Sequence, residues 1–252
     1  MSTTVGDFFL SANAVHGVTG EDYEKINFLI STVKAFARST YQSVYVIDYF
    51  KEGFAYVSDN LAYLCGHPAE RIKEFGYELY INHVPDRDLE MLKEINKKGF
   101  DFINELPVEE RTEYSITYDF HLMNGRRQRL VSHRITPLVL TGDGRVWLAL
   151  CTVAMSAHDK PGNIIMKKEK CNTFYEYSLD RHKWIKKAGI ALSDTERDVL
   201  MLSTQGYTMN EISDRLCKSV DTIKACKRNM FAKMNVRNIA EALSYAINYR
   251  LI

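Results

Sequence analysis

The sequence predicts an α+β domain with one antiparallel sheet, followed by an all-α domain of four helices. Three observations lead to this fold class. The chain has 252 residues, which suits two domains better than one. Between Ser43 and Met155, runs rich in β-branched and aromatic residues alternate with turn residues, as in strands joined by hairpins. From Ala191 onward the sequence instead carries four successive helix-start signals.

The amino-terminal segment, residues 1–40, contains one predicted amphipathic helix. Thr19 and Asp22 have the spacing of a capping box, in which two side chains satisfy backbone N–H groups at the start of a helix. The apolar residues that follow recur at i, i+3, i+4 and i+7 and therefore line one side of a helix. They are Ile26, Leu29, Ile30, Val33, Phe36 and Ala37. This apolar side needs a covering surface, which either its own domain or a second copy of the chain could provide.

Five predicted strands follow, two before a helical insert and three after it. Asn124-Gly125 marks the turn between the third and fourth strands, and Gly142-Asp143-Gly144 marks the next turn. Two strands, an insert and a three-strand meander make one antiparallel sheet. The strands are expected at 43–49, 54–58, 113–123, 127–140 and 146–155, and the helical pieces at 60–66, 68–75 and 85–98.

The order and length of these elements resemble a PAS domain over residues 41–157. The stretches "YVSDNLAYLCGHPAERI", "INHVPDRD" and "HLMNGRRQRLVSHRITPLV" carry the resemblance. It implies a domain that senses a signal, dimerises, or does both. The segment that follows, residues 158–188, is expected to be a linker, with alternating aromatic residues that indicate a β-hairpin.

The last part of the chain is punctuated by helix caps. Capping boxes begin at Ser193, Thr208 and Asn238, and Ser219 can cap a further helix. Gly206 stands where a left-handed residue ends the first of these helices. Only Lys218 to Val220 separate the second helix from the third, which is the short connection of a helix-turn-helix.

The third of these helices concentrates positive charge on its outward side. From Arg215 to Arg237 there are seven basic residues and one acidic residue, against a net charge of +1 for the whole chain. Lys224 and Arg228 are one helical turn apart with the small Ala225 between them. Such a helix can lie in the major groove of DNA, where long cationic side chains reach base edges and a small residue permits close approach.

The stretch from Leu192 to Leu243 resembles the four-helix DNA-binding domain of LuxR/NarL-type (GerE-like) transcriptional regulators, and we assign residues 189–252 to that domain. The residues that match the pattern of the family are Glu196, Val199, Leu200, Gly206, Glu211, Ile212, Leu216, Ser219, Thr222, Lys224, Lys233 and Val236. Cys226 replaces the usual His and Asn235 replaces the usual Gly. The resemblance implies that Lys224, Ala225 and Arg228 read bases, whereas Asn210, Ser219, Thr222 and Lys227 lie near phosphates.

No motif of metal or cofactor chemistry appears in the sequence. The five cysteines include no C-x-x-C pair, and the histidines form no H-x-x-x-H. Cys65 lacks the flanking residues of a flavin-binding photoreceptor. His67 and His83 are the only candidates for an axial haem ligand in the helical insert, and neither has a supporting sequence context. We expect no cofactor and no metal, and no nucleophile-base motif or phosphate loop indicates an enzyme.

These features predict a sequence-specific DNA-binding transcriptional regulator that acts as a homodimer on double-stranded DNA. The PAS-like part is expected to bind a small molecule or a protein. The alternative is a signalling adaptor whose helix-turn-helix is an interaction surface, but the cations at 224 and 228 favour DNA. The longest apolar run, residues 146–155, is about half the length of a membrane span, and no secretory signal is apparent, so a cytoplasmic protein is expected.

Overall fold

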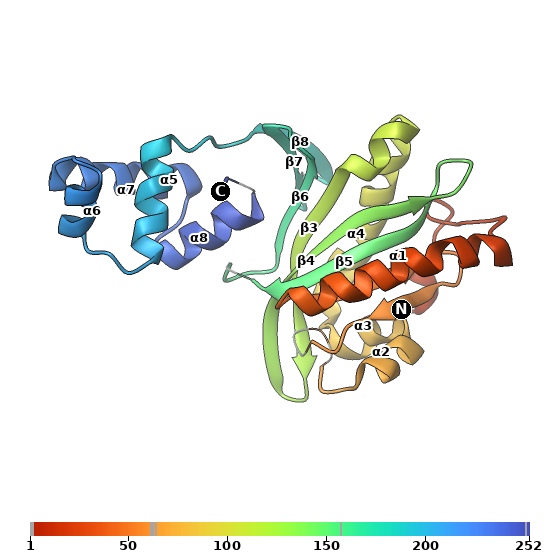
Figure 1. The fold of residues 1–252 in the computed structure, drawn as a ribbon. Coiled ribbons are helices and arrows are strands. Elements are labelled where there is room, and N and C mark those ends of the chain that lie inside the picture. Colours follow the sequence, from red (N-terminus) through yellow and green to blue (C-terminus); the bar gives the residue numbers. More distant parts are fainter. Residues whose placement is uncertain (1–2, 61–62, 64, 157, 250) are drawn as a thin grey trace. The chain divides into compact units, whose positions relative to one another are not determined.

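The computed structural model describes residues 3–60, 63, 65–156, 158–249 and 251–252, and within them the chain divides into two compact units (Figure 1). The first unit is Met1–Lys187 and the second is Ala188–Ile252. The first is an α+β fold with an antiparallel sheet and the second is all-α, so the predicted fold class is confirmed. No helix in the described part of the chain is long and apolar enough to cross a membrane.

The first unit is built on one antiparallel sheet. In the described residues its strand order is β2-β1-β5-β4-β3-β6-β7-β8, so the first five strands form a block with β2 at its edge and β1 beside β5. The strands are β1 Ser43–Asp48, β2 Gly53–Val57, β3 Tyr114–Asn124, β4 Arg127–Leu140, β5 Val146–Met155, β6 Gly162–Lys168, β7 Thr173–Ser178 and β8 Lys183–Ala188. The five strands expected from the sequence are therefore present, each within two residues of its predicted limits.

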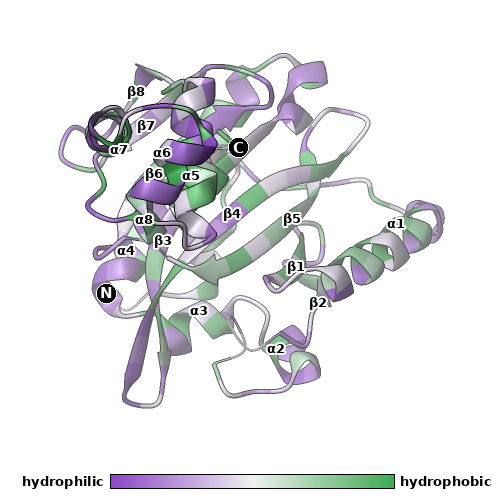
Figure 2. Cartoon of the chain, turned by 60° about the vertical axis from the view of Figure 1, so that its left-hand side comes forward, coloured by the Kyte–Doolittle hydropathy of each residue, from purple (hydrophilic) through white to green (hydrophobic). Residues whose placement is uncertain are grey.

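Helices cover both faces of this sheet around β1, whose six residues are all buried. On one face, Tyr23 of α1 donates a hydrogen bond of 2.6 Å to Asp48. On the other face, the hydroxyl of Tyr45 lies 2.5 Å from that of Tyr80 in α3. The helical elements of this unit are η1 Val5–Phe8, α1 Gly20–Ser39, α2 Ala69–Phe75, α3 Glu78–His83, α4 Asp86–Glu105 and η2 Val108–Glu113. Figure 2 shows apolar residues along the strands that these helices cover.

The segment at 158–188, expected as a linker with a hairpin, contains three strands of the same sheet. Strand β6 pairs with β3, and β7 and β8 follow it outward. Side chains from β7 and β8 hold α4: Tyr177 donates to Glu94, and the indole N–H of Trp184 donates to the carbonyl of Lys98. Residues 158–187 therefore belong to the first compact unit.

The second unit contains four helices: α5 Asp194–Thr204, α6 Met209–Arg215, α7 Val220–Met234 and α8 Ile239–Asn248. Each begins at the cap expected from the sequence, because the side chains of Ser193, Thr208, Ser219 and Asn238 each accept a hydrogen bond from a backbone N–H of the first turn. Gly206 has a positive φ of 89° after α5, as the sequence predicted. The helix caps predicted from the sequence therefore begin the four helices of this domain.

Candidate nucleic-acid interface

The turn between α6 and α7 is short and internally bonded. The backbone N–H of Lys218 donates to the carbonyl of Ser213, and the Ser213 hydroxyl donates back to the carbonyl of Lys218. Cys217 adopts a φ of 50°, so the chain reverses direction through one left-handed residue. The two helices are therefore held in a fixed helix-turn-helix arrangement.

The inner side of α7 packs into the domain core. Ile223, Met230 and Met234 are buried and lie on one side of the helix. Ile223 packs with Val199 and Ile212, while Met230 and Met234 join a cluster with residues from α5 and α8. This packing fixes which side of α7 faces outward.

The three residues expected to read bases lie on the opposite side of α7. Lys224 and Arg228 are exposed and Ala225 is half-buried. Lys224 lies 3.6 Å from Asp221, an exposed pair that solvent weakens. Arg228 has no charged partner among the described residues, so its guanidinium is available to a ligand. Helix α7 has 15 residues and is about 22 Å long, which suits a major groove.

Of the four residues expected near phosphates, three are exposed at the starts of α6 and α7, and the fourth, Lys227, lies within α7. Asn210 is exposed at the start of α6, and Ser219 and Thr222 are exposed at the start of α7. The Ser219 hydroxyl caps α7 and lies 2.8 Å from that of Thr222. Lys227 is half-buried, with its ammonium 5.7 Å from the centre of the Phe231 ring. Its aliphatic stem follows the apolar side while the charge remains at the edge.

Arg215 extends this basic surface and was not among the predicted contacts. Its guanidinium stacks 4.1 Å from the ring centre of Tyr207 and donates to the Tyr207 hydroxyl at 2.9 Å. Stacking of this kind holds the guanidinium plane in place. The two residues are eight positions apart and Tyr207 lies outside α6, so the sequence did not predict that they are in contact.

An ion pair between a half-exposed lysine of α7 and a buried carboxylate of α5 also holds α7 in place. Glu196 of α5 is buried, and Lys233 lies 2.7 Å from one of its oxygens. The same carboxylate accepts hydrogen bonds from the backbone N–H and the hydroxyl of Ser193. Burial raises the pKa of Glu196, but these bonds from Lys233 and Ser193 lower it more, so the pKa lies below its ordinary value. The pair ties the end of α7 to the start of α5.

The two departures from the family pattern are accommodated in the structure. Asn235 adopts a left-handed conformation at the end of α7, with φ 54° and ψ 46°. Asparagine adopts this conformation more readily than other residues with a side chain, so it can replace glycine here. Cys226 is half-buried against the core of Val199, Ile212 and Ile223. Burial raises the pKa of its thiol, which behaves as a small apolar group.

A second candidate site is a buried polar cluster in the first unit. The imidazole Nε2 of His133 lies 2.6 Å from the hydroxyl of Tyr45, which also contacts Tyr80. The Nδ1 of His133 has no hydrogen-bond partner among the described residues. Burial lowers the pKa of His133 to about 3, so the ring is neutral. A buried imidazole nitrogen without a partner can receive a ligand or a water molecule.

A small apolar cavity adjoins this cluster at Tyr118, whose ring lies 5.0 Å from that of His133. Its volume is about 50 Å³, and it lies between α4 and the sheet. Residues that line it include Tyr49, Gly99, Phe100, Tyr118, Ala149 and Met166. A space of this size holds water molecules, and a larger ligand would require the surrounding side chains to move.

The histidines and the cysteine considered for cofactors contact one another or the backbone. The Nε2 atoms of His67 and His83 are 3.2 Å apart, and Nδ1 of His83 lies 3.0 Å from the carbonyl of Met123. The thiol of Cys65 is buried and donates to a backbone carbonyl. No group of three or more metal-binding side chains occurs in the part of the chain that the structure describes.

Comparison with known proteins places the second unit in a family. Residues 191–246 match the model of the bacterial regulatory proteins of the luxR family. The transcriptional activator protein BglJ of Escherichia coli is 34% identical over 65 residues, which are 26% of this chain and 29% of BglJ. The oxygen regulatory protein NreC of Staphylococcus carnosus is 34% identical over 61 residues, which are 24% of this chain and 28% of NreC. The chain thus spans under a third of the length of these relatives.

Solved structures that match most of this chain are more distant from it in sequence. The phage VqmA-DPO complex covers 92% of this chain and 91% of its own chain at 16% identity, with a TM-score of 0.32. The Vibrio cholera VqmA-ligand-DNA complex covers 87% of this chain and 86% of its own at 12% identity, with a TM-score of 0.31. TM-scores this low support no conclusion about this chain. The family match, the cap pattern and the packing of α7 together show that the carboxy-terminal unit is a luxR-family helix-turn-helix domain.

Proposed function

We propose that this chain is a transcriptional regulator that binds a specific sequence of double-stranded DNA through α7. The observation that carries the proposal is the outward side of α7, where Lys224 and Arg228 are exposed beside Ala225. The core residues on the other side of the helix leave it no alternative orientation. Guanidinium and ammonium groups donate to the N7 and O6 atoms of guanine, and the small residue lets the helix enter the groove.

The backbone contacts come from the start of α7 and from neighbouring cations. Ser219 and Thr222 present hydroxyl groups at the positive end of the helix, where backbone N–H groups also favour a phosphate. Arg215 and Asn210 of α6 are also exposed, and Lys227 of α7 is half-buried. We assign phosphate contacts to these residues because hydroxyl, amide and cationic side chains all donate hydrogen bonds to phosphate oxygens.

A single domain of this kind binds DNA weakly. With a few phosphate contacts, non-specific binding has a dissociation constant of ~10⁻⁴–10⁻⁶ M at physiological salt. Two copies on paired half-sites multiply the contacts, since two-fold symmetric proteins match two-fold symmetric DNA sites. The proposal therefore includes a homodimer, in the cytoplasm, without a catalytic role.

The first unit is proposed to sense a small molecule at the buried polar cluster. Nδ1 of His133 has no partner among the described residues, and its ring lies against Tyr45 and Tyr118. A small neutral ligand with one polar atom would satisfy the nitrogen, and the side chains around the adjoining cavity would have to move to admit its apolar part. An occupied cluster would change the sheet and α4, which β7 and β8 connect to the second unit along the chain.

The DNA-binding proposal is tested by selecting bound sequences from a random duplex library. The wild-type protein is compared with the Lys224→Ala/Arg228→Ala double variant, and Met201→Ala in α5 serves as a surface control. We expect the wild type and the control to enrich one site with two related halves, and the double variant to enrich none. Equal enrichment by the double variant would refute base reading by α7.

A further inference from the structure

Helix α1 presents an apolar surface that its own domain leaves uncovered. Phe28 is 82% exposed and Phe36 is 47% exposed, although both are large aromatic residues. Thr32 and Ala35 lie between them and are also exposed. These four residues, which we call the α1 stripe, follow i, i+4, i+7 and i+8 and so share one side of the helix.

The orientation of α1 on the sheet is fixed, so the stripe cannot turn inward. Ile26, Val33 and Ala37 are buried on the opposite side of the helix. Tyr23 donates to Asp48 at 2.6 Å and packs edge-on against Trp147, with ring centres 5.2 Å apart. Rolling the helix to bury Phe28 would break these contacts and expose the buried residues. The stripe therefore requires a partner from outside the domain.

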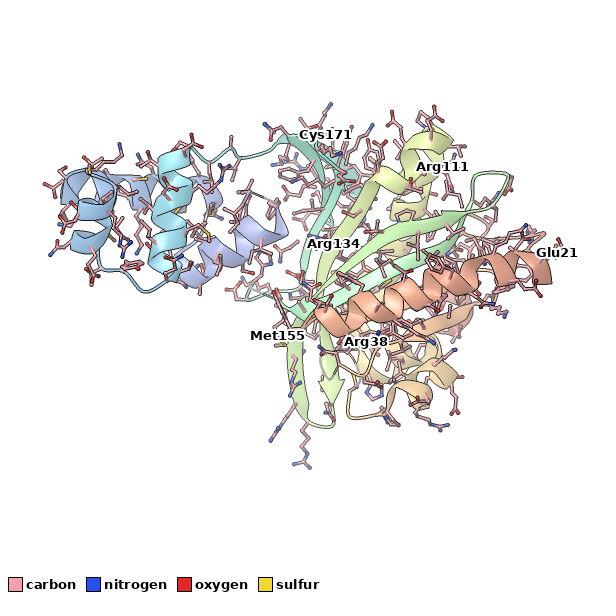
Figure 3. The ribbon with its side chains drawn as sticks, viewed as in Figure 1. Glu21, Arg38, Arg111, Arg134, Met155 and Cys171 are labelled. Atoms are coloured by element: carbon pink, nitrogen blue, oxygen red, sulfur yellow. The ribbon has the colours of Figure 1, made fainter. Side chains whose placement is uncertain are left out.

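The charges along α1 identify the partner. The first half of the helix carries Glu21, Asp22 and Glu24 together with Lys25, which lies 3.4 Å from Asp22, and the second half carries Lys34 and Arg38. Figure 3 shows Glu21 and Arg38 at opposite ends of the helix. Neither Glu24 nor Arg38 forms an ion pair within the described residues, so both charges are available at the two ends of the α1 stripe.

We infer that the α1 stripe binds the α1 stripe of a second copy of this chain, with the two helices antiparallel. A two-fold axis beside Thr32 places Phe28 of each copy against Phe36 of the other. The same axis brings Glu24 of each copy within reach of Arg38 of the other, because the two lie on one flank of the stripe. A parallel pair would instead place like charges together and align the helix dipoles unfavourably.

This pairing deepens the proposed function, because it supplies the homodimer that binding to two half-sites requires. It also uses no residue of α7, since the contact lies entirely within the first unit. The aromatic side chains supply the apolar core of the interface and the Glu24–Arg38 pairs fix its direction. Two-fold symmetry means that each substitution acts twice.

The test is the molar mass of the full chain in solution, measured by light scattering over a range of concentrations. We expect the wild type to have twice the 29.1 kDa mass of one chain. Phe28→Ser should raise the dimer dissociation constant by about a hundredfold, because a central aromatic anchor is lost twice. Met201→Ser removes a similarly exposed apolar side chain from α5 and should leave the mass unchanged. An unchanged far-ultraviolet circular dichroism spectrum and a cooperative unfolding transition show that each variant is folded.

Charge reversal tests the pairing independently, because it leaves the apolar residues of the α1 stripe unchanged. Glu24→Arg and Arg38→Glu should each weaken the dimer by about tenfold, and the double reversal should restore it. A monomeric wild type, or a dimer indifferent to both Phe28→Ser and the reversals, overturns the pairing. A dimeric wild type that selects no DNA site would refute the proposed function and leave the pairing intact. A monomer that selects one half-site would overturn the pairing and the homodimer of the proposed function, and would leave base reading by α7 intact.

Discussion

Burial of a neutral His133 makes the stability of the first unit depend on pH. The imidazole is fully buried, and burial lowers its pKa to about 3 from an ordinary value near 6.5. In the unfolded chain the same side chain takes up a proton below its ordinary pKa of about 6.5. Between pH 6.5 and pH 3 the unfolded state therefore binds one more proton than the folded state, and the free energy of unfolding falls as the pH falls.

The size of this effect follows from the difference in proton binding. One pKa unit corresponds to about 1.4 kcal/mol, so lowering the pH from 7.5 to 5.0 should remove about 2 kcal/mol of stability through His133 alone. A matched variant removes the pH dependence that does not come from His133, because both proteins share every other group. His133→Phe keeps an aromatic ring against Tyr45 and Tyr118 but cannot bind a proton.

The assay is urea unfolding followed by tryptophan fluorescence. Both tryptophans of the chain, Trp147 and Trp184, lie in the first unit, so the signal reports on that unit. We expect the free energy of unfolding to fall by about 2 kcal/mol more in the wild type than in His133→Phe between pH 7.5 and pH 5.0. Parallel pH profiles for the two proteins would refute a neutral, buried His133.

Three further predictions concern the second unit. Arg228→Ala should weaken binding to the selected site by about 1–3 kcal/mol and binding to unrelated DNA much less, measured by fluorescence anisotropy; equal loss on both would assign Arg228 to the phosphates. Glu196→Gln removes the anchor of Lys233 and half of a capping box, and should cost about 1–2 kcal/mol in calorimetric unfolding above pH 5; an unchanged melting temperature would contradict this role. Asn235→Gly should stabilise the domain and Asn235→Ala should destabilise it, each by about 1 kcal/mol, because the site is left-handed; the same sign for both would contradict that conformation.

The carboxy-terminal domain was largely predictable because its signals are local. Each helix begins at a residue whose side chain accepts a hydrogen bond from the backbone N–H three residues later, as Ser193 does from Glu196. The outward side of α7 followed from helical spacing, which placed Lys224 and Arg228 one turn apart on the surface, where both are exposed. Its contacts with other helices, such as that of Lys233 with Glu196, depend on packing between residues 37 positions apart and could not be derived from spacing.

The first unit was predictable in its strands but not in its buried chemistry. Alternation and turn residues located β1 to β5, whereas β6 to β8 have mixed exposure and many charges and were interpreted as a linker. The contact of Tyr45 with His133 joins residues 88 positions apart, and neither side chain lies in a local motif. Some of the expected helical piece at 60–66 lies outside the described residues.

The central claim is that α7 reads DNA sequence, and the ratio of specific to non-specific affinity tests it most directly. The measurement compares binding of the full chain to the selected duplex and to a shuffled duplex at the same salt concentration. We expect the wild type to prefer the selected duplex by at least about a thousandfold, and the Lys224→Ala/Arg228→Ala variant to lose most of that preference while retaining weak binding to both. A wild-type ratio near one, or a ratio that the double variant preserves, would contradict the account.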